Sequence, residues 1–346
     1  MDSPVTQAQY ATQLSDDTLR DMYRAMLLSR RLDERCWALH RQGKIAFHVS
    51  AIGHEGLQVA AAFALNRGID FTYPYYRDLA FCIALGLTPL DFMLSVFGKA
   101  GEPSSGGRQM PSHWSSREKH IVSQSSVVAV QVPQAAGTAF AINYKRKVGL
   151  LAADDTTQPR LAYASVGEGG TSQGEWHEAM NWAGIHKLPF ICMVENNQYA
   201  ISVPFDKQSA VPLVERAHGY GVIGVQVDGN DVFATYDAVR AAAERAYTGE
   251  GATLIEAITY RLVPHSSDDD DRSYRTREEV QEWKQKDPLL RFQAELLNQG
   301  VLTQARIDAF EEAIQASITE AQQQAEAAPD PDIASGLSGV YAEETI

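Results

Sequence analysis

Short apolar runs alternate with stretches of helical periodicity along most of this 346-residue chain. The clearest unit begins with an apolar run at 161–166, continues with a helical pattern over about 174–186, and ends with a second apolar run at 190–194. Apolar runs of this length are typical of buried strands, and Pro189 separates the helix from the second run. The pattern therefore predicts a strand, a helix and a second strand, with the two strands parallel.

The same alternation continues toward the C-terminus. Apolar runs at 222–227 and 253–263 predict two more strands, and the Ala-rich stretch 237–247 between them predicts a helix. Before the central unit, the weakly alternating stretch 123–132 leads to a predicted helix over 134–144. The fold class we expect is α/β, with a doubly wound, mostly parallel sheet.

Helices are expected at both ends of the chain. Ser15 can cap an N-terminal helical arm, and Thr303 can cap a C-terminal helix that has an apolar stripe. We expect a flexible N-terminus over 1–14, a single α/β domain with helical extensions over 15–330, and a C-terminal tail over 331–346. Three arginines of the N-terminal arm are expected on a solvated helix face: Arg30, Arg31 and Arg35.

The net charge and the composition argue against several classes of binding partner. The net charge of −14 argues against nucleic acid, because no basic field would attract its phosphates. Cys36, Cys82 and Cys192 have neither a disulfide pattern nor metal-ligand spacing, and we expect buried thiols. The sequence shows no secretory signal and no apolar run long enough to span a membrane, so we expect a cytoplasmic protein without a membrane partner.

Polar clusters follow both strands of the central unit. The turn 167–170 contains Glu168 between glycines, and 195–197 follows the second strand. At the carboxyl edge of a parallel sheet these clusters meet where ligands bind. The helix that begins near Ser172 suits an anion such as phosphate, but Glu168 would repel one, and a divalent cation between them resolves the conflict. The residues thus predict a metal–diphosphate site of the Mg²⁺ type.

Two alternatives to this site remain open at this stage. A dinucleotide fingerprint fits less well, because Ser172 stands where the third glycine belongs. A glycine turn followed by a solvated asparagine turn, without any ligand, is the other alternative. A zinc-protease helix at His54-Glu55 is excluded, because position 58 is Gln58 and not histidine.

The Gly-acid-Gly turn and Asn196-Asn197, which lies 28 positions after Glu168, resemble the thiamine diphosphate motif. Glutamate in place of the usual aspartate resembles the branched-chain members. Further matches are Tyr76-Arg77-Asp78, the stretch 107–111, the stretch 131–134, and Tyr260-Arg261 through His265-Ser266-Ser267. Together they resemble the alpha subunit of the dehydrogenase component of 2-oxo acid dehydrogenase complexes, and they cover most of the chain.

The resemblance implies a thiamine diphosphate-binding fold and a set of site residues. Side-chain oxygens of Glu168 and Asn197 and the backbone carbonyl of Tyr199 would bind Mg²⁺. Arg77 would contact the diphosphate, and His265 would be catalytic. The implied cofactor-binding residues are Tyr76, Arg77, Ser126, Val128, Gly167, Glu168, Gly169, Gly170, Asn197, Tyr199 and His265.

Several positions depart from the family pattern or have an open role. Branched-chain relatives hold a monovalent cation near Ser125 and Gln131, and a further hydroxyl ligand is expected where this chain has Val130. Glu195 replaces an arginine of some branched-chain members, which removes one expected phosphate contact.

His113 could be structural or could belong to the active site. The stretch 146–160 is longer than the family pattern and is expected to be a solvated insertion.

The activity implied by the resemblance is oxidative decarboxylation of branched-chain 2-oxo acids. The acyl group would pass to the lipoyl arm of the acyltransferase core of the complex. The sequence lacks a motif for the glutamate that activates the cofactor's aminopyrimidine ring. In the family this residue comes from a separate beta subunit, so the resemblance implies an α2β2 heterotetramer. The alternatives are a pyruvate or acetoin dehydrogenase alpha subunit and a non-catalytic cofactor-binding subunit.

Overall fold

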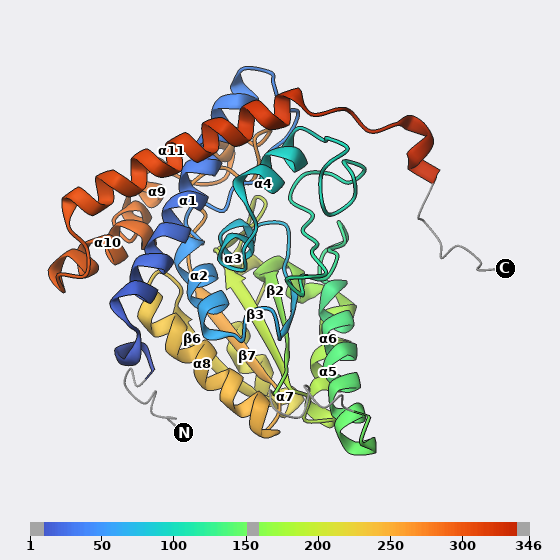
Figure 1. Cartoon of the computed structure of the whole chain (residues 1–346). Coiled ribbons are helices and arrows are strands. Elements are labelled where there is room, and N and C mark those ends of the chain that lie inside the picture. Colours follow the sequence, from blue (N-terminus) through green and yellow to red (C-terminus); the bar gives the residue numbers. More distant parts are fainter. Residues whose placement is uncertain (1–9, 151–158, 338–346) are drawn as a thin grey trace.

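A parallel sheet of five strands forms the centre of the computed structural model, which describes residues 10–150 and 159–337 (Figure 1). The spatial order is β1-β2-β3-β7-β6, and every neighbouring pair is parallel. The bounds are β1 Phe71–Tyr73, β2 Ala162–Gly167, β3 Phe190–Asn196, β6 Ile223–Asp228 and β7 Thr253–Ile258. The predicted α/β class with a mostly parallel sheet is confirmed, as is the parallel pairing of the two central strands.

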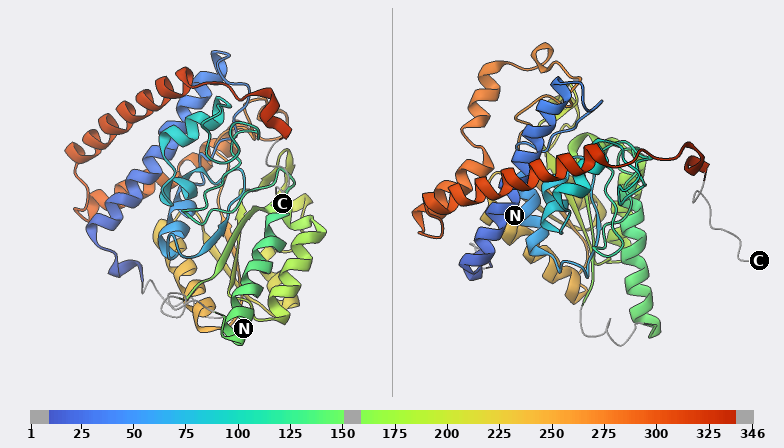
Figure 2. Two further views of the ribbon diagram at one scale, coloured as in Figure 1. Left: turned by 45° about the vertical axis from the view of Figure 1, so that its right-hand side comes forward. Right: turned by 45° about the horizontal axis from the view of Figure 1, so that its top comes forward.

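Helices cover both faces of the sheet, so alternate strand residues enter two different cores. In β2, Tyr163 packs into the core formed with α2 (Glu55–Ala64), α3 (Leu79–Ala84) and α8 (Val232–Thr248). Its neighbours Ala162 and Ala164 pack into the core formed with α5 (Gln131–Val148) and α6 (Gly174–Ile185), which lie side by side (Figures 1 and 2). Burial on both faces explains why the strands are continuous apolar runs.

The N-terminal and C-terminal helices form an outer layer over α2 to α4, as expected for helical extensions (Figures 1 and 2). The bounds of the elements outside the sheet and its covering helices are α1 Asp16–Arg41, α4 Pro89–Val96, α7 Arg216–Tyr220, α9 Arg277–Lys284, α10 Pro288–Asn298, α11 Gln304–Ala327, and a short hairpin of β4 Tyr199–Ala200 and β5 Val203–Pro204. None of the helices among the described residues is long and apolar enough to cross a membrane.

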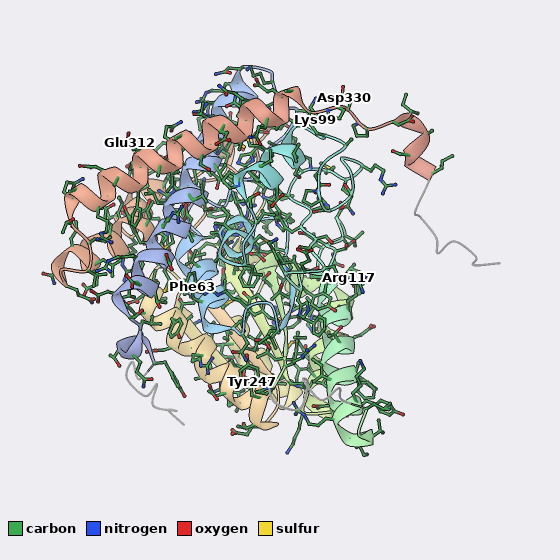
Figure 3. All side chains as sticks on the ribbon, in the orientation of Figure 1. Phe63, Lys99, Arg117, Tyr247, Glu312 and Asp330 are labelled. Atoms are coloured by element: carbon green, nitrogen blue, oxygen red, sulfur yellow. The ribbon has the colours of Figure 1, made fainter. Side chains whose placement is uncertain are left out.

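Both predicted helix caps are confirmed. The side chain of Ser15 accepts a hydrogen bond from the backbone N–H of Thr18 at 3.2 Å, and that of Thr303 accepts one from Arg306 at 3.3 Å. After α11, Asp330 pairs with Lys99 at 2.7 Å, which ties the chain back to the loop that follows α4 (Figure 3). The cysteines are buried and free, also as expected.

The predicted bounds of two helices and one strand were wrong. The helix expected over 237–247 begins at Val232 and ends at Thr248, because Asp231 caps it. The helix expected over 134–144 begins at Gln131 and continues to Val148, because Pro133 is tolerated in the first turn of a helix. The strand expected over 253–263 ends at Ile258. The Thr259 N–H donates to the carbonyl of Asn196, which is the last residue of β3. Beyond this hydrogen bond β3 has no further residue with which β7 could pair, so the strand ends.

The domain division of the chain remains a prediction. Residues 1–9 of the expected flexible terminus, residues 151–158 of the expected insertion, and residues 338–346 of the expected tail lie outside the described residues. Within the described part, Tyr10 and Ala11 donate backbone hydrogen bonds to one side-chain oxygen of Asp237, at 3.1 Å and 2.6 Å. The chain therefore has fixed contacts with α8 before Ser15.

The expectation that Arg30 lies on a solvated face was wrong. Its guanidinium is buried between Glu55 at the start of α2 and Asp287 at the cap of α10, at 2.5 Å and 2.9 Å. The neighbouring Arg31 is partly exposed and pairs with Glu34 and Glu311. A helical pattern alone does not tell these two arginines apart, since the partners of Arg30 come from distant parts of the chain.

Arg30→Ala should lower the free energy of unfolding by about 3–5 kcal/mol, because it leaves two buried carboxylates without their cation. Arg31→Ala, one position along the same helix, should cost no more than about 1 kcal/mol, because its ion pairs are partly solvated. Denaturant titration of both variants measures the difference. Equal losses for the two variants would contradict the buried ion-pair assignment.

Candidate functional site

Four strands of the sheet deliver the predicted residues to one edge. Tyr76 and Arg77 follow β1, Glu168 follows β2, Asn197 follows β3, and the segment that carries His265 follows β7. Because these strands are parallel, all four segments leave the sheet at its carboxyl edge. The expected juxtaposition of the two polar clusters is therefore present.

Glu168 opens a 3₁₀ turn, Glu168–Ser172, that leads into α6. Its side chain is buried, with the residue 2% exposed, and burial raises its pKa above the ordinary glutamate value. One carboxylate oxygen accepts a hydrogen bond from the backbone N–H of Asn197 at 3.3 Å, and the other accepts one from the Gln208 side chain at 3.5 Å. Gln208 has no sequence signal that links it to this turn, and it was not predicted.

The three residues that are expected to bind the metal, Glu168, Asn197 and Tyr199, are linked by consecutive hydrogen bonds. The Asn197 side-chain oxygen accepts from the Tyr199 backbone N–H at 3.3 Å, and the Tyr199 carbonyl accepts from Arg261 at 3.2 Å. Gln198 between them has a φ of 75°, a left-handed conformation that closes this tight turn. Among the described residues no group of three or more His, Cys, Asp or Glu side chains could hold a metal. A carboxylate, an amide and a carbonyl form a different kind of ligand set, one that suits Mg²⁺.

Gly169 and Gly170 of the turn are required by close packing within the protein. A Cβ at Gly169 would lie 2.7 Å from the Cβ of Ala200, and a Cβ at Gly170 would lie 2.4 Å from Val166 and 2.9 Å from Val128. The predicted site residue Val128 thus lies directly against the turn. The nearest constraint on Gly169 and Gly170 is therefore the fold itself.

Arg77 forms the cationic side of the site. It is buried, and its Nη1 donates to the Ser50 carbonyl at 2.5 Å, while Nη2 lies 3.3 Å from Nδ1 of His265. The Tyr76 ring contacts both, at 5.4 Å from the guanidinium carbon and 6.3 Å from the His265 ring. The next residue, Asp78, accepts a hydrogen bond from the Tyr75 N–H at 2.9 Å.

Arg261 completes this side of the site and was not among the site residues predicted from the sequence. Its Nη1 lies 3.3 Å from the same Nδ1 of His265, and its Nη2 donates to the Ile201 carbonyl at 2.7 Å and to the Tyr274 hydroxyl at 2.9 Å. The signal was its place four residues before His265 within a motif that was already noted. Only the folded loop shows that both arginines approach one imidazole nitrogen.

Several buried nitrogens here have no hydrogen-bond partner among the described residues: Nε of Arg77, Nε of Arg261, and both ring nitrogens of His54. His54 is fully buried, and both arginines lower its pKa after burial itself, which is the largest cause. The Nε–H groups of the two guanidinium groups are buried donors without an acceptor among the described residues, which is a favourable setting for a phosphate or carboxylate. The residues present therefore fit the diphosphate of the implied cofactor.

His265 is held as a neutral imidazole. Burial, followed by the charges of Arg77 and Arg261, lowers its pKa to about 3. Since guanidinium groups only donate, Nδ1 accepts and the ring hydrogen is on Nε2. The backbone N–H of His265 donates to the Asp269 side chain at 2.7 Å, which fixes the turn that carries the ring.

The remaining predicted residues lie in the loop before α5 and at the start of that helix. The Ser126 hydroxyl is hydrogen-bonded to Nε2 of His113, so His113 contacts an expected cofactor residue. The Gln131 side chain donates to the Ser165 carbonyl at 2.8 Å, and the Ser125 hydroxyl accepts from Val127 at 3.1 Å. The monovalent cation site near these two residues remains a prediction.

Gly170→Ala should destabilise the protein by about 1–3 kcal/mol, because the added methyl overlaps Val166 in the buried strand. Gly174→Ala is the matched control, since a Cβ there has no neighbour within 4 Å and alanine favours the helix. Thermal unfolding of the two variants tests this. A melting temperature for Gly170→Ala at or above that of Gly174→Ala would refute the close packing.

The lowered pKa of His265 predicts an acid-side loss of stability. An unfolded histidine takes up its proton near pH 6.5, whereas the folded residue does so near pH 3. Between these values the unfolded chain binds more protons, so the free energy of unfolding falls as the pH falls, by at most about 1.4 kcal/mol per pH unit. His265→Asn should show a shallower slope from pH 6.5 to 5, and the exposed His218→Asn serves as the control. Identical slopes in all three proteins would contradict the prediction.

Comparison with known proteins agrees with this geometry. The model of the family described as "Dehydrogenase E1 component" matches residues 23–334. The 2-oxoisovalerate dehydrogenase subunit alpha of Bacillus subtilis is 49% identical over 97% of this chain and 99% of its own length. The pyruvate dehydrogenase E1 component subunit alpha of the same organism is 38% identical, over 95% and 83%. The 3-methyl-2-oxobutanoate dehydrogenase subunit alpha of Mycobacterium tuberculosis is 35% identical, over 99% and 88%. The chain therefore belongs to the dehydrogenase E1 component family of thiamine diphosphate-dependent oxidoreductases.

Proposed function

We propose that this chain is the alpha subunit of a branched-chain 2-oxo acid dehydrogenase, which decarboxylates branched-chain 2-oxo acids oxidatively and transfers the acyl group to a lipoyl arm. The observation that carries this proposal is the meeting of two ligand sets at one sheet edge, in a chain that matches the whole length of a 2-oxoisovalerate dehydrogenase subunit. Oxygen ligands around Glu168 lie on one side, and the buried donors of Arg77 and Arg261 lie on the other.

The oxygen ligands and the cationic side chains bind different parts of the cofactor. Glu168 and Asn197 supply side-chain oxygens to Mg²⁺, and Tyr199 supplies its carbonyl. Arg77 neutralises the diphosphate, for which the planar guanidinium is well suited. The surrounding residues Tyr76, Ser126, Val128, Gly167, Gly169 and Gly170 shape the surface on which the cofactor lies.

When bound, thiamine diphosphate supplies the carbanion that attacks the 2-oxo group and the electron sink for decarboxylation. The contribution of the chain is orientation and electrostatics. His265 is the catalytic residue: its neutral ring keeps a hydrogen on Nε2, which can donate to a developing negative charge, while Nδ1 is held between Arg77 and Arg261. The two cations also disfavour protonation of the ring, so it remains a neutral donor across the physiological range.

The proposed assembly is an α2β2 heterotetramer, in which the beta subunit supplies the glutamate that activates the aminopyrimidine ring. The acyltransferase core would bring the lipoyl arm to His265. Membership of a family of alpha-type subunits supports a multi-subunit enzyme. The net charge of −14 gives no support for nucleic acid as a further partner. The cytoplasmic location inferred from the sequence stays a prediction.

Branched-chain substrates are favoured over pyruvate by two observations. Identity is higher to the 2-oxoisovalerate dehydrogenase subunit, 49%, than to the pyruvate dehydrogenase subunit of the same organism, 38%. The metal turn also carries Glu168, where the usual family acid is aspartate. A pyruvate or acetoin enzyme would have the same mechanism, and a non-catalytic cofactor-binding subunit is the alternative from another class.

The test is decarboxylation of 3-methyl-2-oxobutanoate and of pyruvate by this chain co-expressed with its beta subunit, with Mg²⁺ and thiamine diphosphate. We expect faster turnover of the branched substrate. Glu168→Ala should reduce Mg²⁺-dependent cofactor binding by at least roughly 100-fold and abolish turnover, because it removes the one carboxylate of the ligand set. Glu175→Ala, at an exposed position on α6, is the matched control and should behave as wild type.

Each result has a distinct meaning. Preference for pyruvate would overturn the branched-chain assignment and leave the mechanism in place. Cofactor binding without turnover of either substrate would favour the non-catalytic subunit. Unchanged cofactor binding by Glu168→Ala, measured by calorimetry, would refute the proposed metal site.

A further inference from the structure

The loop that carries His265 is hydrogen-bonded to a segment that is far from it in the sequence. We name residues 264–275 the histidine loop and residues 48–53, which lead into α2, the bridging segment. Ser267 donates its backbone N–H to the carbonyl of His48 at 2.9 Å, and the N–H of His48 donates to the Ser267 hydroxyl at 3.0 Å. This reciprocal pair of hydrogen bonds lies two residues from His265.

Further contacts continue along the bridging segment toward the end of β7. The Ile52 carbonyl accepts from the Leu262 N–H at 3.4 Å, and the Gly53 carbonyl accepts from the Thr259 hydroxyl at 2.7 Å. The Ser50 carbonyl accepts from Arg77. The bridging segment therefore contacts the chain before His265, the chain after it, and an arginine that approaches its ring.

The bridging segment is itself fixed by one buried carboxylate. Asp33 on α1 is fully buried, and it uses both of its oxygens on this segment. Oδ1 is hydrogen-bonded to Nε2 of His48, and Oδ2 accepts from the Ala51 N–H at 2.9 Å. A carboxylate buried in an apolar layer is costly unless it is fully hydrogen-bonded, so the geometry of these partners is strongly specified.

Aromatic packing restricts the His48 ring as well. The ring is fully buried, with edge contacts to Trp37 at 6.2 Å and Phe92 at 6.3 Å. Because the ring cannot turn without breaking its bond to Asp33, the backbone of His48 has a defined position. That backbone is the part that holds Ser267.

We propose that Asp33 and His48 are positioning residues, which transmit the rigidity of α1 through Ser267 to His265. Contacts within the histidine loop, such as Asp269 with the His265 N–H and Asp271 with Arg275, hold its local shape, whereas its position relative to α1 needs a restraint from outside the loop. The pair Asp33–His48 supplies such a restraint on the inner side of the loop. A small displacement of a catalytic group lowers the rate of reaction more than it lowers binding. The pair thus acts on turnover through the placement of the His265 ring.

The test uses the chain co-expressed with its beta subunit and loaded with Mg²⁺ and thiamine diphosphate. Hydrogen exchange of peptides spanning 262–270 measures the order of the loop, and steady-state kinetics separates kcat from KM. Ser267→Ala removes the hydroxyl that accepts from His48, and Asp33→Asn leaves one of its two donors without an acceptor. Both variants should exchange faster in the loop and lose roughly fivefold in kcat, with KM within about twofold, as for the loss of one hydrogen bond.

Two controls make the readout specific. Ser267→Thr keeps the accepting hydroxyl and should restore the exchange and kcat of the wild type. His40→Gln removes a second link between α1 and the loop, the partly exposed contact of His40 with Asp268 at 3.4 Å, and should change neither quantity. The double variant Asp33→Asn/Ser267→Ala should be no worse than the worse single variant, because both break the same chain of contacts.

The outcomes separate this inference from the proposed function on which it rests. Unchanged exchange in Ser267→Ala, additive losses in the double variant, or faster exchange with unaltered kcat would each overturn the positioning role. If Asp33→Asn does not fold, the comparison of Ser267→Ala with Ser267→Thr decides the question alone. Absence of turnover in the wild-type protein would count against the proposed function, whereas the exchange data would still decide whether the pair orders the loop.

Discussion

The parallel register of β2, β3 and β7 is the constraint on which the rest of the site depends. Gly167 pairs with Glu195, and Glu195 pairs with Ala257, so the three strands reach the edge of the sheet at the same level. Helices bury both faces, and polar groups from separate parts of the sequence are gathered where the strands end. A shift of one strand by a single residue would reverse its two faces and remove its polar end from the cluster.

The residues gathered at this edge of the sheet include buried charged groups, and burying each of them without a partner would be unfavourable. Arg77 and Arg261 bring two buried cations to one imidazole nitrogen, and Glu168 is a carboxylate whose pKa burial raises. Buried charges of this kind need partners of opposite sign. In the proposed function, a divalent cation beside Glu168 and a diphosphate beside Arg77 satisfy both needs with one ligand. The same logic explains why both oxygens of the buried Asp33 carboxylate are hydrogen-bonded.

Much of the candidate site was predictable because its signals are local. The turn around Glu168 and the Asn197 segment each follow an apolar run, and parallel strands place such segments at one edge. Arg261 was harder to identify, because its importance depends on a loop that folds back over four residues to bring His265 beside it.

The sequence by itself determined the class of fold and the chemistry of the strand ends, because apolar runs, helical spacing and turn residues act over short distances. Only the tertiary structure decided which charges are buried and which partners they meet. Arg30 and Arg31 are adjacent on one helix, yet Arg30 is enclosed by Glu55 and Asp287, while Arg31 pairs at the surface. Desolvation and long-range pairing depend on segments far apart in the chain, and no local pattern carries that information.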